Sequence, residues 1–238
     1  MTSDADYMAM AIEAAAGARH RASPNPWVGA VIVSPDGSVV TGATHAYGGV
    51  HAEIDALSKA GDAAGAGVYC TLEPCNHTGR TGPCTDALID AGVRRVVIGI
   101  EDPDPQVAGA GSARLRDAGI EVVTGIGADA VTRQLRPYLH HRTTGRPWVV
   151  LKLAASLDGR TAAPDGTSQW ITGPEARSDV HRLRAESDAI VVGAGTVRAD
   201  DPALTVRDWP GPADDIDPGE VSDPRRVVLG TAPSGARV

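Results

Sequence analysis

Phenylalanine is absent from this chain of 238 residues, and aromatic residues make up only 3% of it. The hydrophobic core must therefore consist mainly of aliphatic side chains. Long apolar runs are also missing, since no stretch reaches the roughly 18 residues that a membrane-spanning helix needs. The first residues lack the basic and apolar regions of a signal peptide. These absences predict a cytoplasmic protein that does not span a membrane.

Cysteine is scarce as well, with three in the whole chain. This number is odd and too small for a disulfide framework, and in a reducing compartment such thiols more often bind a metal or react. Excess positive charge is also missing, because the formal net charge is -8. A dedicated nucleic-acid-binding protein usually has a basic surface. The composition therefore argues against a nucleic-acid partner and makes the cysteines candidates for chemistry.

The first part of the chain alternates between helical and extended patterns. An Ala-rich stretch from Tyr7 to Arg19 has apolar residues at helical spacing. Two aliphatic runs, 28–33 and 39–44, flank a Pro-Asp-Gly turn and predict a β-hairpin. Further helices and strands are predicted in alternation at 52–60, 68–72, 85–91, 93–100, 112–118 and 120–124. This alternation predicts an α/β sandwich around one sheet.

A polar segment at 140–147 predicts a boundary between two domains, 1–145 and 146–238. In the second domain the sequence predicts three strands and one helix, at 149–154, 174–184, 189–192 and 226–229. So few strands leave the faces and edges of a sheet uncovered. We therefore expect a domain that has been cut short, and its open sheet edge favours self-association into a homo-oligomer.

The motif His51-Ala52-Glu53, followed by Pro74-Cys75 and then Cys84, supplies an imidazole, a carboxylate and two thiols. One His and two Cys can hold Zn²⁺ and leave a fourth position for water, while a Glu that does not bind the metal moves protons. Both His51 and Cys75 precede a predicted helix, whose N-terminus favours thiolate and carboxylate. The pattern predicts a zinc-dependent deaminase with His51, Cys75 and Cys84 as metal ligands and Glu53 as the catalytic residue.

Simpler interpretations of these residues stay open. A purely structural zinc usually has four protein ligands, and His77 offers a fourth, although Glu53 would then have no role. Iron or cobalt could replace zinc on the same ligands. Cys70 lies in a predicted strand and is expected to be a buried small apolar residue.

Three short motifs, Asn25-Pro26-x-Val28-Gly29-Ala30-Val31, His51-Ala52-Glu53 and Thr71-Leu72-Glu73-Pro74-Cys75, are typical of the cytidine-deaminase-like superfamily. Most members have two residues between the cysteines, but this chain has eight, in a loop that ends Gly-Arg-Thr-Gly-Pro-Cys. That loop, together with the stretch 101–109, resembles the bifunctional riboflavin-biosynthesis deaminase/reductase family. Gly82 departs from the proline that is common in that family.

The second domain resembles the same family independently, at 152–162, 169–172 and 193–202. These stretches are similar to the beginning of a reductase domain that has a dihydrofolate-reductase-like fold and normally continues well beyond Val238. The resemblance therefore implies an α/β chain in which a cytidine-deaminase-like three-layer α/β/α domain is followed by a partial dihydrofolate-reductase-like domain.

The resemblance also implies ligands and reactions. The substrate would be a phosphorylated pyrimidine, 2,5-diamino-6-(5-phosphoribosylamino)pyrimidin-4(3H)-one, which loses an amino group by hydrolysis with Zn²⁺. NADPH would then reduce the product, 5-amino-6-(5-phosphoribosylamino)uracil. NADPH contacts are implied at Ala154, Trp170, Thr196, Asp200 and Thr231. Substrate contacts of the reductase domain are implied at Ser168, Arg184, Leu204 and Arg207.

Other interpretations of the second domain and of the activity are kept. Trp170 by itself favours a core position, and the Gly-rich segment 193–196 is either a phosphate-binding loop or a plain turn. Arg184 and Arg207 suit a sugar phosphate but are also common on solvated surfaces. The chain could be a monofunctional deaminase with an inactive reductase remnant, or a deaminase of free nucleosides or tRNA. A deaminase of nucleosides or of tRNA would have two residues between the cysteines, and a tRNA deaminase would also have a basic surface.

Overall fold

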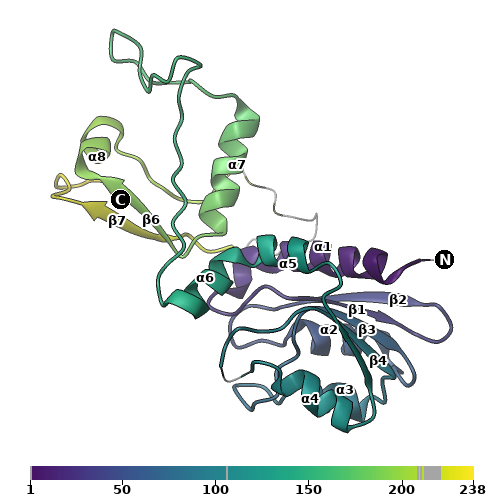
Figure 1. The fold of residues 1–238 in the computed structure, drawn as a ribbon. Helices are drawn as coiled ribbons and strands as arrows, with labels where there is room; N and C mark the ends of the chain where they lie inside the picture. Colours follow the sequence, from purple (N-terminus) through teal and green to yellow (C-terminus); the bar gives the residue numbers. More distant parts are fainter. Residues whose placement is uncertain (1, 106, 208, 210, 212–220) are drawn as a thin grey trace. The chain divides into compact units, whose positions relative to one another are not determined.

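The computed structural model describes residues 2–105, 107–207, 209, 211 and 221–238. The chain divides into two compact units between Trp148 and Val149 (Figure 1). Each unit is built around its own sheet, and each is described separately below.

The first unit contains a five-stranded sheet with the order β2-β1-β3-β4-β5. Its strands in chain order are β1 (Gly29–Val33), β2 (Val39–Ala43), β3 (Gly67–Leu72), β4 (Arg95–Ile100) and β5 (Glu121–Thr124). The predicted hairpin is confirmed, because β1 pairs antiparallel with β2. β3 runs antiparallel to β1, whereas β3, β4 and β5 are mutually parallel. The carboxyl ends of β3 and β4 therefore lie together at one edge of the sheet.

Helices cover both faces of this sheet, which gives three layers. The helices of the first unit are α1 (Asp4–Ala22), α2 (Ala52–Ala60), α3 (Cys84–Asp90), α4 (Ala110–Asp117), α5 (Ala128–Gln134) and α6 (Arg136–Thr144). Figure 1 shows α1 and α5 on one face and α2, α3 and α4 on the other. The core between these layers is aliphatic, as expected from the composition, and Ile32, Leu88 and Ile98 have no exposed surface.

Two glycines allow the helices to approach the sheet closely. A Cβ on Gly29 would lie 1.9 Å from the backbone oxygen of Ala11 in α1, and one on Gly42 would lie 2.4 Å from that of Ala52 in α2. Any side chain at these positions would push a helix away from the sheet. Because α2 carries Glu53, the packing at Gly42 also helps to place a candidate site residue.

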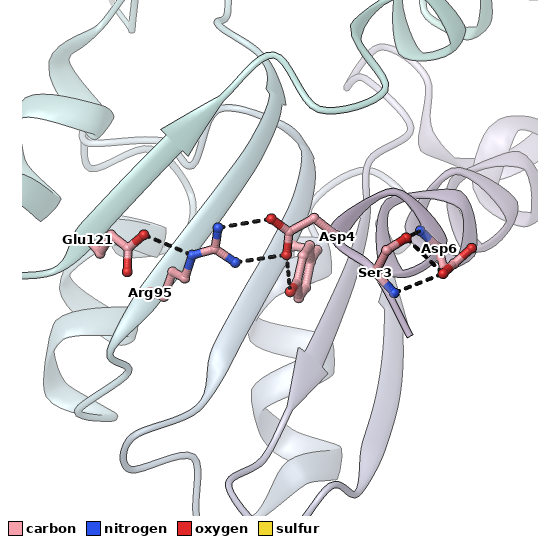
Figure 2. A network of polar contacts seen from close by, with 6 residues as sticks. Ser3, Asp4, Asp6, Arg95 and Glu121 are labelled. Carbon is pink, nitrogen blue, oxygen red and sulfur yellow. Dashed lines mark hydrogen bonds and ion pairs between the residues drawn. The ribbon is translucent and has the colours of Figure 1, made fainter. Parts of the chain in front are cut away.

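Helix α1 begins earlier than the Tyr7 that the sequence predicted, because Ser3 and Asp6 form a capping box. The extension brings Asp4 to Arg95, whose guanidinium donates to both carboxylate oxygens of Asp4 at 2.8 and 2.9 Å (Figure 2). Arg95 also donates to Glu121 at 3.0 Å, and the hydroxyl of Tyr69 donates to Asp4 at 2.8 Å. This network, the Asp4 network below, ties the first turn of α1 to β3, β4 and β5.

The helices α5 and α6 were not predicted, and α6 covers most of the polar segment that was predicted to be a boundary. Helix α6 was missed because its surface is polar: its mean hydropathy is low, and Tyr138 is its only buried residue. Pro137 lies in its first turn, and Gly145 ends it with φ 68°.

The described residues of the second unit form four regular elements, α7 (Pro174–Ala185), β6 (Ala189–Gly193), α8 (Ala194–Asp200) and β7 (Arg225–Leu229). β6 and β7 pair in parallel, as a two-stranded sheet. The predicted strand at 149–154 is wrong: this segment has no helix or strand, and Val149 and Leu151 are 79% and 80% exposed. A strand needs a paired neighbour, and among the described residues none pairs with this segment. The Gly-rich segment at 193–196 is also not a loop, because α8 begins at Ala194.

Among the helices that the structure describes, none combines the length and the apolar character needed to cross a membrane.

Candidate metal centre and catalytic pocket

Three predicted metal ligands come together at the edge of the sheet of the first unit. His51 is the N-cap of α2, Cys75 follows the end of β3, and Cys84 is the first residue of α3. The Nδ1 atom of His51 lies 3.6 Å from Sγ of Cys75 and 3.3 Å from Sγ of Cys84. One ligand atom from each of the three residues lies within 4.8 Å of the others. The long loop between the cysteines therefore returns the chain to the metal centre.

Within this cluster the pKa values of the two thiols are shifted in opposite directions. The side chain of Cys84 donates toward Cys75 and lowers the pKa of Cys75 to about 4, while the same contact and burial raise the pKa of Cys84. The backbone N–H of Cys84 also donates to Sγ of Cys75, at 3.4 Å. The hydrogen bond to Cys75 raises the pKa of His51. Two sulfurs and one imidazole form a donor set that fits Zn²⁺, which binds by displacing their protons.

His77, the alternative fourth ligand, is exposed and does not belong to the cluster of described donors. Glu53, by contrast, is only 3% exposed and lies in the first turn of α2, two residues after His51. Burial, and after it the charge of Cys75, raise the pKa of Glu53. A buried carboxyl that holds a proton more tightly than usual is suited to accept and return protons. Cys70 is fully buried, as predicted for a small apolar residue.

A pocket of about 390 Å³ opens over these residues. His51, Glu53 and Cys75 line it from one side. The other lining residues come from the loops around the sheet edge and from α6, and include Asn25, Thr44, Tyr47, His77, Arg80, Asp102, Asp104, Tyr138 and Arg142. The candidate metal ligands are therefore accessible from a concave, largely polar space of the size that holds a small ligand.

One wall of the pocket is a hydrogen-bonded group around Asp102. The hydroxyl of Tyr138 donates to both carboxylate oxygens of Asp102, at 3.1 and 3.0 Å. The backbone N–H of Asp104 donates to Asp102 at 2.9 Å, and Arg142 lies 3.4 Å from the carboxylate of Asp104. Burial raises the pKa of Asp102. Sequence reasoning noted the stretch 101–109 but missed Tyr138 and Arg142, because they lie on the unpredicted helix α6.

The predicted substrate residues of the reductase domain gather partly around one histidine of α7, His181. Its Nδ1 accepts the backbone N–H of Arg207 at 3.1 Å and lies 3.4 Å from the guanidinium of Arg184. Arg184 also donates to the backbone oxygen of Thr205 at 3.1 Å, beside the buried Leu204. Burial, followed by the nearby charge of Arg207, lowers the pKa of Arg184. The structure thus brings three of the four predicted residues into one region of the second unit.

The predicted cofactor residues are more scattered. Thr196 and Asp200 lie on α8, directly after β6, and Thr231 follows β7. Because β6 and β7 are neighbouring parallel strands, these three residues all lie beyond the carboxyl ends of the strands. Ala154, Ser168 and Trp170 lie in the segment 149–172, which has no helix or strand. Trp170 is 69% exposed and stacks under Arg177 at 4.5 Å, so the core position favoured by its residue type is wrong.

Comparisons with known proteins agree with both halves of this description. Residues 1–100 match the family described as cytidine and deoxycytidylate deaminase zinc-binding region, and residues 147–236 match the RibD C-terminal domain. The riboflavin biosynthesis protein RibD of Escherichia coli is 53% identical over 206 residues, covering 86% of this chain and 56% of the relative. The chain thus spans less than two thirds of the length of that relative.

A second relative and a solved structure match over nearly the whole chain. RibD of Mycobacterium tuberculosis is 50% identical over 238 residues, covering 98% of this chain and 68% of the relative. A crystal structure from Thermotoga maritima is described as a diaminohydroxyphosphoribosylaminopyrimidine deaminase/5-amino-6-(5-phosphoribosylamino)uracil reductase. It superposes with a TM-score of 0.84 at 40% identity, covering 95% of this chain and 63% of the other.

These matches confirm the predicted fold class, a cytidine-deaminase-like domain followed by a dihydrofolate-reductase-like domain. The chain belongs to the RibD family of riboflavin biosynthesis proteins.

Proposed function

We propose that this chain removes the 2-amino group of 2,5-diamino-6-(5-phosphoribosylamino)pyrimidin-4(3H)-one by hydrolysis, using Zn²⁺ held by His51, Cys75 and Cys84. The observation that carries the proposal is the convergence of these ligands within 4.8 Å beside the buried Glu53, in a pocket that can admit a small substrate. A purely structural zinc would leave this buried carboxyl without a role.

In the reaction, water adds to the ring carbon that bears the amino group, and ammonia leaves. Bound zinc would lower the pKa of a water molecule and so supply the nucleophile near neutral pH. Glu53 accepts a proton from that water and delivers it to the ring nitrogen. It then carries the second proton, from the added hydroxyl, to the amino group, which leaves as ammonia while the ring carbonyl forms. The raised pKa of Glu53 suits both directions of transfer, because a carboxyl of ordinary pKa gives up its proton too readily to act as an acid near neutral pH.

The remaining pocket residues offer recognition of a polar, anionic substrate. Asp102 can accept hydrogen bonds from ring N–H or amino groups, and its raised pKa reflects a site shielded from water. Arg80 and Arg142 line the same pocket and can bind the phosphate, since guanidinium pairs with phosphate oxygens at fixed geometry.

For the second unit we propose NADPH-dependent reduction of the ribosyl group of 5-amino-6-(5-phosphoribosylamino)uracil. Arg184, Leu204 and Arg207, with Ser168, would hold the substrate. The buried Nε of Arg184 has no hydrogen-bond partner among the described residues, and an unpaired donor of that kind fits a phosphate oxygen. Ala154, Trp170, Thr196, Asp200 and Thr231 would hold NADPH, which supplies the hydride when bound.

The proposed division of labour follows the predicted domains, 1–145 for deamination and 146–238 for reduction. We further propose a cytoplasmic protein that forms homo-oligomers and binds no nucleic acid. Three cysteines without disulfides support the location, and the net charge of -8 supports a small-molecule substrate over a nucleic acid.

One experiment tests both activities. The purified chain, loaded with zinc, is incubated with the phosphorylated diaminopyrimidine, with and without NADPH. Ammonia release in both samples supports the deaminase, and NADPH oxidation that requires prior deamination supports the reductase. Ammonia release without NADPH oxidation would instead identify a monofunctional deaminase. No ammonia release from protein that contains one zinc ion per chain would contradict the proposed function.

A further inference from the structure

A second buried carboxylate lies beside the metal centre and takes no part in the chemistry described above. Glu73 follows the last residue of β3 and is 4% exposed. Its carboxylate accepts three backbone N–H groups: Oε1 accepts from Ser112 at 2.9 Å, and Oε2 accepts from Gly109 at 3.0 Å and from Asp102 at 3.3 Å. Both oxygens of this carboxylate are thus engaged by backbone donors, which suits a structural connection.

Two of these three donors belong to the first turn of α4. Gly109 is the N-cap of this helix, with φ 78°, and has no side chain that could cap it. Ser112 is the third residue of the helix. In an ordinary capping box, residues of the helix itself satisfy these two N–H groups. Here Glu73, which follows β3 and lies 36 residues before Gly109 in the chain, satisfies them instead. The start of α4 is therefore tied to the end of β3.

The third donor connects the same carboxylate to the pocket. Asp102 lines the same pocket as His51 and Cys75, and Glu73 is separated from Cys75 only by Pro74. The segments are also packed tightly, because a Cβ on Gly111 would lie 2.1 Å from the backbone oxygen of Pro74. One side chain therefore links the loop that carries a metal ligand to the loop that carries the pocket wall.

We propose that Glu73 is a positioning residue that fixes the distance between the metal centre and the Asp102 wall, and thereby sets how tightly the pyrimidine is bound. The inference rests on the proposed deaminase function. Glu73 also lines the pocket, but backbone N–H groups hold both of its carboxylate oxygens, so we assign it no proton transfer. It acts through Asp102, whose carboxylate would face the substrate, and through Cys75, whose sulfur would hold the metal.

The test is the Glu73→Gln variant in the full chain. A glutamine keeps one acceptor oxygen and places an NH₂ group against a backbone donor, so at least one of the three bonds is lost. We expect KM for the phosphorylated diaminopyrimidine to rise about tenfold, while kcat changes less than about threefold. Zinc content per chain should stay at the wild-type value. The matched control is Glu101→Gln, which makes the same change on an exposed side chain of the neighbouring segment and should leave both constants unchanged.

A second variant reaches the same contact without altering the carboxylate. Gly111→Ala places a methyl group against the backbone oxygen of Pro74, which pushes the first turn of α4 away from the Pro74 segment, and it should also raise KM more than kcat. Amide hydrogen exchange measured on zinc-loaded protein gives a readout besides activity. The amides of Asp102, Gly109 and Ser112 should exchange faster in Glu73→Gln than in the control.

The outcomes separate the two proposals. An active wild-type protein whose KM is unchanged in both variants contradicts the positioning role, even if thermal stability falls, because the carboxylate would then be only a helix cap. Unchanged exchange at the three amides overturns the inference whether or not the chain is a deaminase. Absence of ammonia release by the wild-type protein contradicts the deaminase proposal itself.

Discussion

The two units of this chain differ in how far their apolar residues are buried. In the first unit, Ile98 and Leu115 have no exposed surface, and helices cover both faces of a five-stranded sheet. In the part of the second unit that the structure describes, the sheet has two strands, and Leu151 and Leu153 are 80% and 70% exposed. The first unit therefore has a closed core of its own, whereas much of the apolar surface of the second remains in contact with solvent.

The candidate sites follow the same difference. Each metal ligand of the first unit lies at the start of a helix or the end of a strand that packs into the core. In the second unit, the residues that converge, Arg184 and Arg207, are tied to His181 of helix α7. Of the predicted cofactor contacts, Thr196 and Asp200 lie on the short helix α8, whereas Ala154 and Trp170 lie on a segment without helix or strand. A preorganised site depends on rigid elements behind it, and the comparison shows this dependence within one chain.

A substitution at Glu53 tests most directly whether the two units work independently. The Glu53→Gln variant keeps the shape of the side chain but cannot accept a proton, so ammonia release should fall by about 10² to 10⁴-fold. Because the two proposed sites belong to separate units, NADPH oxidation with the deaminated product as substrate should be unchanged. Steady-state kinetics of both half-reactions measure the effect.

The control for this variant is Glu13→Gln on the exposed side of α1, which should leave both half-reactions unchanged. Metal analysis must accompany the kinetics. Retention of full ammonia release by zinc-loaded Glu53→Gln protein would contradict the proposed proton shuttle and favour a structural zinc.

The sequence was sufficient to predict the cluster of His51, Cys75 and Cys84 but not the pocket around it. His51 and Cys75 were predictable because motifs at the junctions of strands and helices fix local geometry. Tyr138 could not be predicted in the same way. It lies on the polar helix α6, and its hydrogen-bond partner Asp102 is 36 residues away in the sequence. The same limit explains the wrong strand at 149–154, since the alternation of its residues is a local property while pairing depends on a neighbouring strand.

The difference in core burial should appear as a difference in mutational sensitivity. Ile98→Ala removes a fully buried side chain from β4 and should lower the free energy of unfolding of the first unit by about 2–5 kcal/mol. Leu151→Ala removes a side chain that is 80% exposed and should change stability by less than about 0.5 kcal/mol. Urea denaturation of the full chain, followed by far-UV circular dichroism, gives both values. Equal losses in the two variants would mean that Leu151 is packed in solution.

The Asp4 network gives a smaller effect that is confined to the first unit. Arg95→Met retains much of the aliphatic length but removes the paired bonds to Asp4 and the bond to Glu121 (Figure 2). We expect a loss of about 1–2 kcal/mol, since the geometry is good but the carboxylates are partly exposed to solvent. Thermal denaturation should show a lower Tm, with no change in zinc content. Arg94→Met, at the adjacent exposed position, is the matched control.

The pH dependence of this network is the finest test. The hydrogen bonds from Arg95 lower the pKa of Asp4 to about 2 in the folded protein, compared with about 3.9 in an unfolded chain. Between these values the unfolded state binds more protons, so the contribution of Asp4 is complete above about pH 4 and is lost as the pH falls toward 2. The stability difference between wild type and Arg95→Met should therefore be constant from pH 7 to about 5 and shrink by about 1 kcal/mol at pH 2.5. Carboxylates that do not contact Arg95 titrate equally in both proteins and cancel in this difference. A difference that stays constant down to pH 2.5 would show that the carboxylate of Asp4 gains nothing from Arg95 beyond packing.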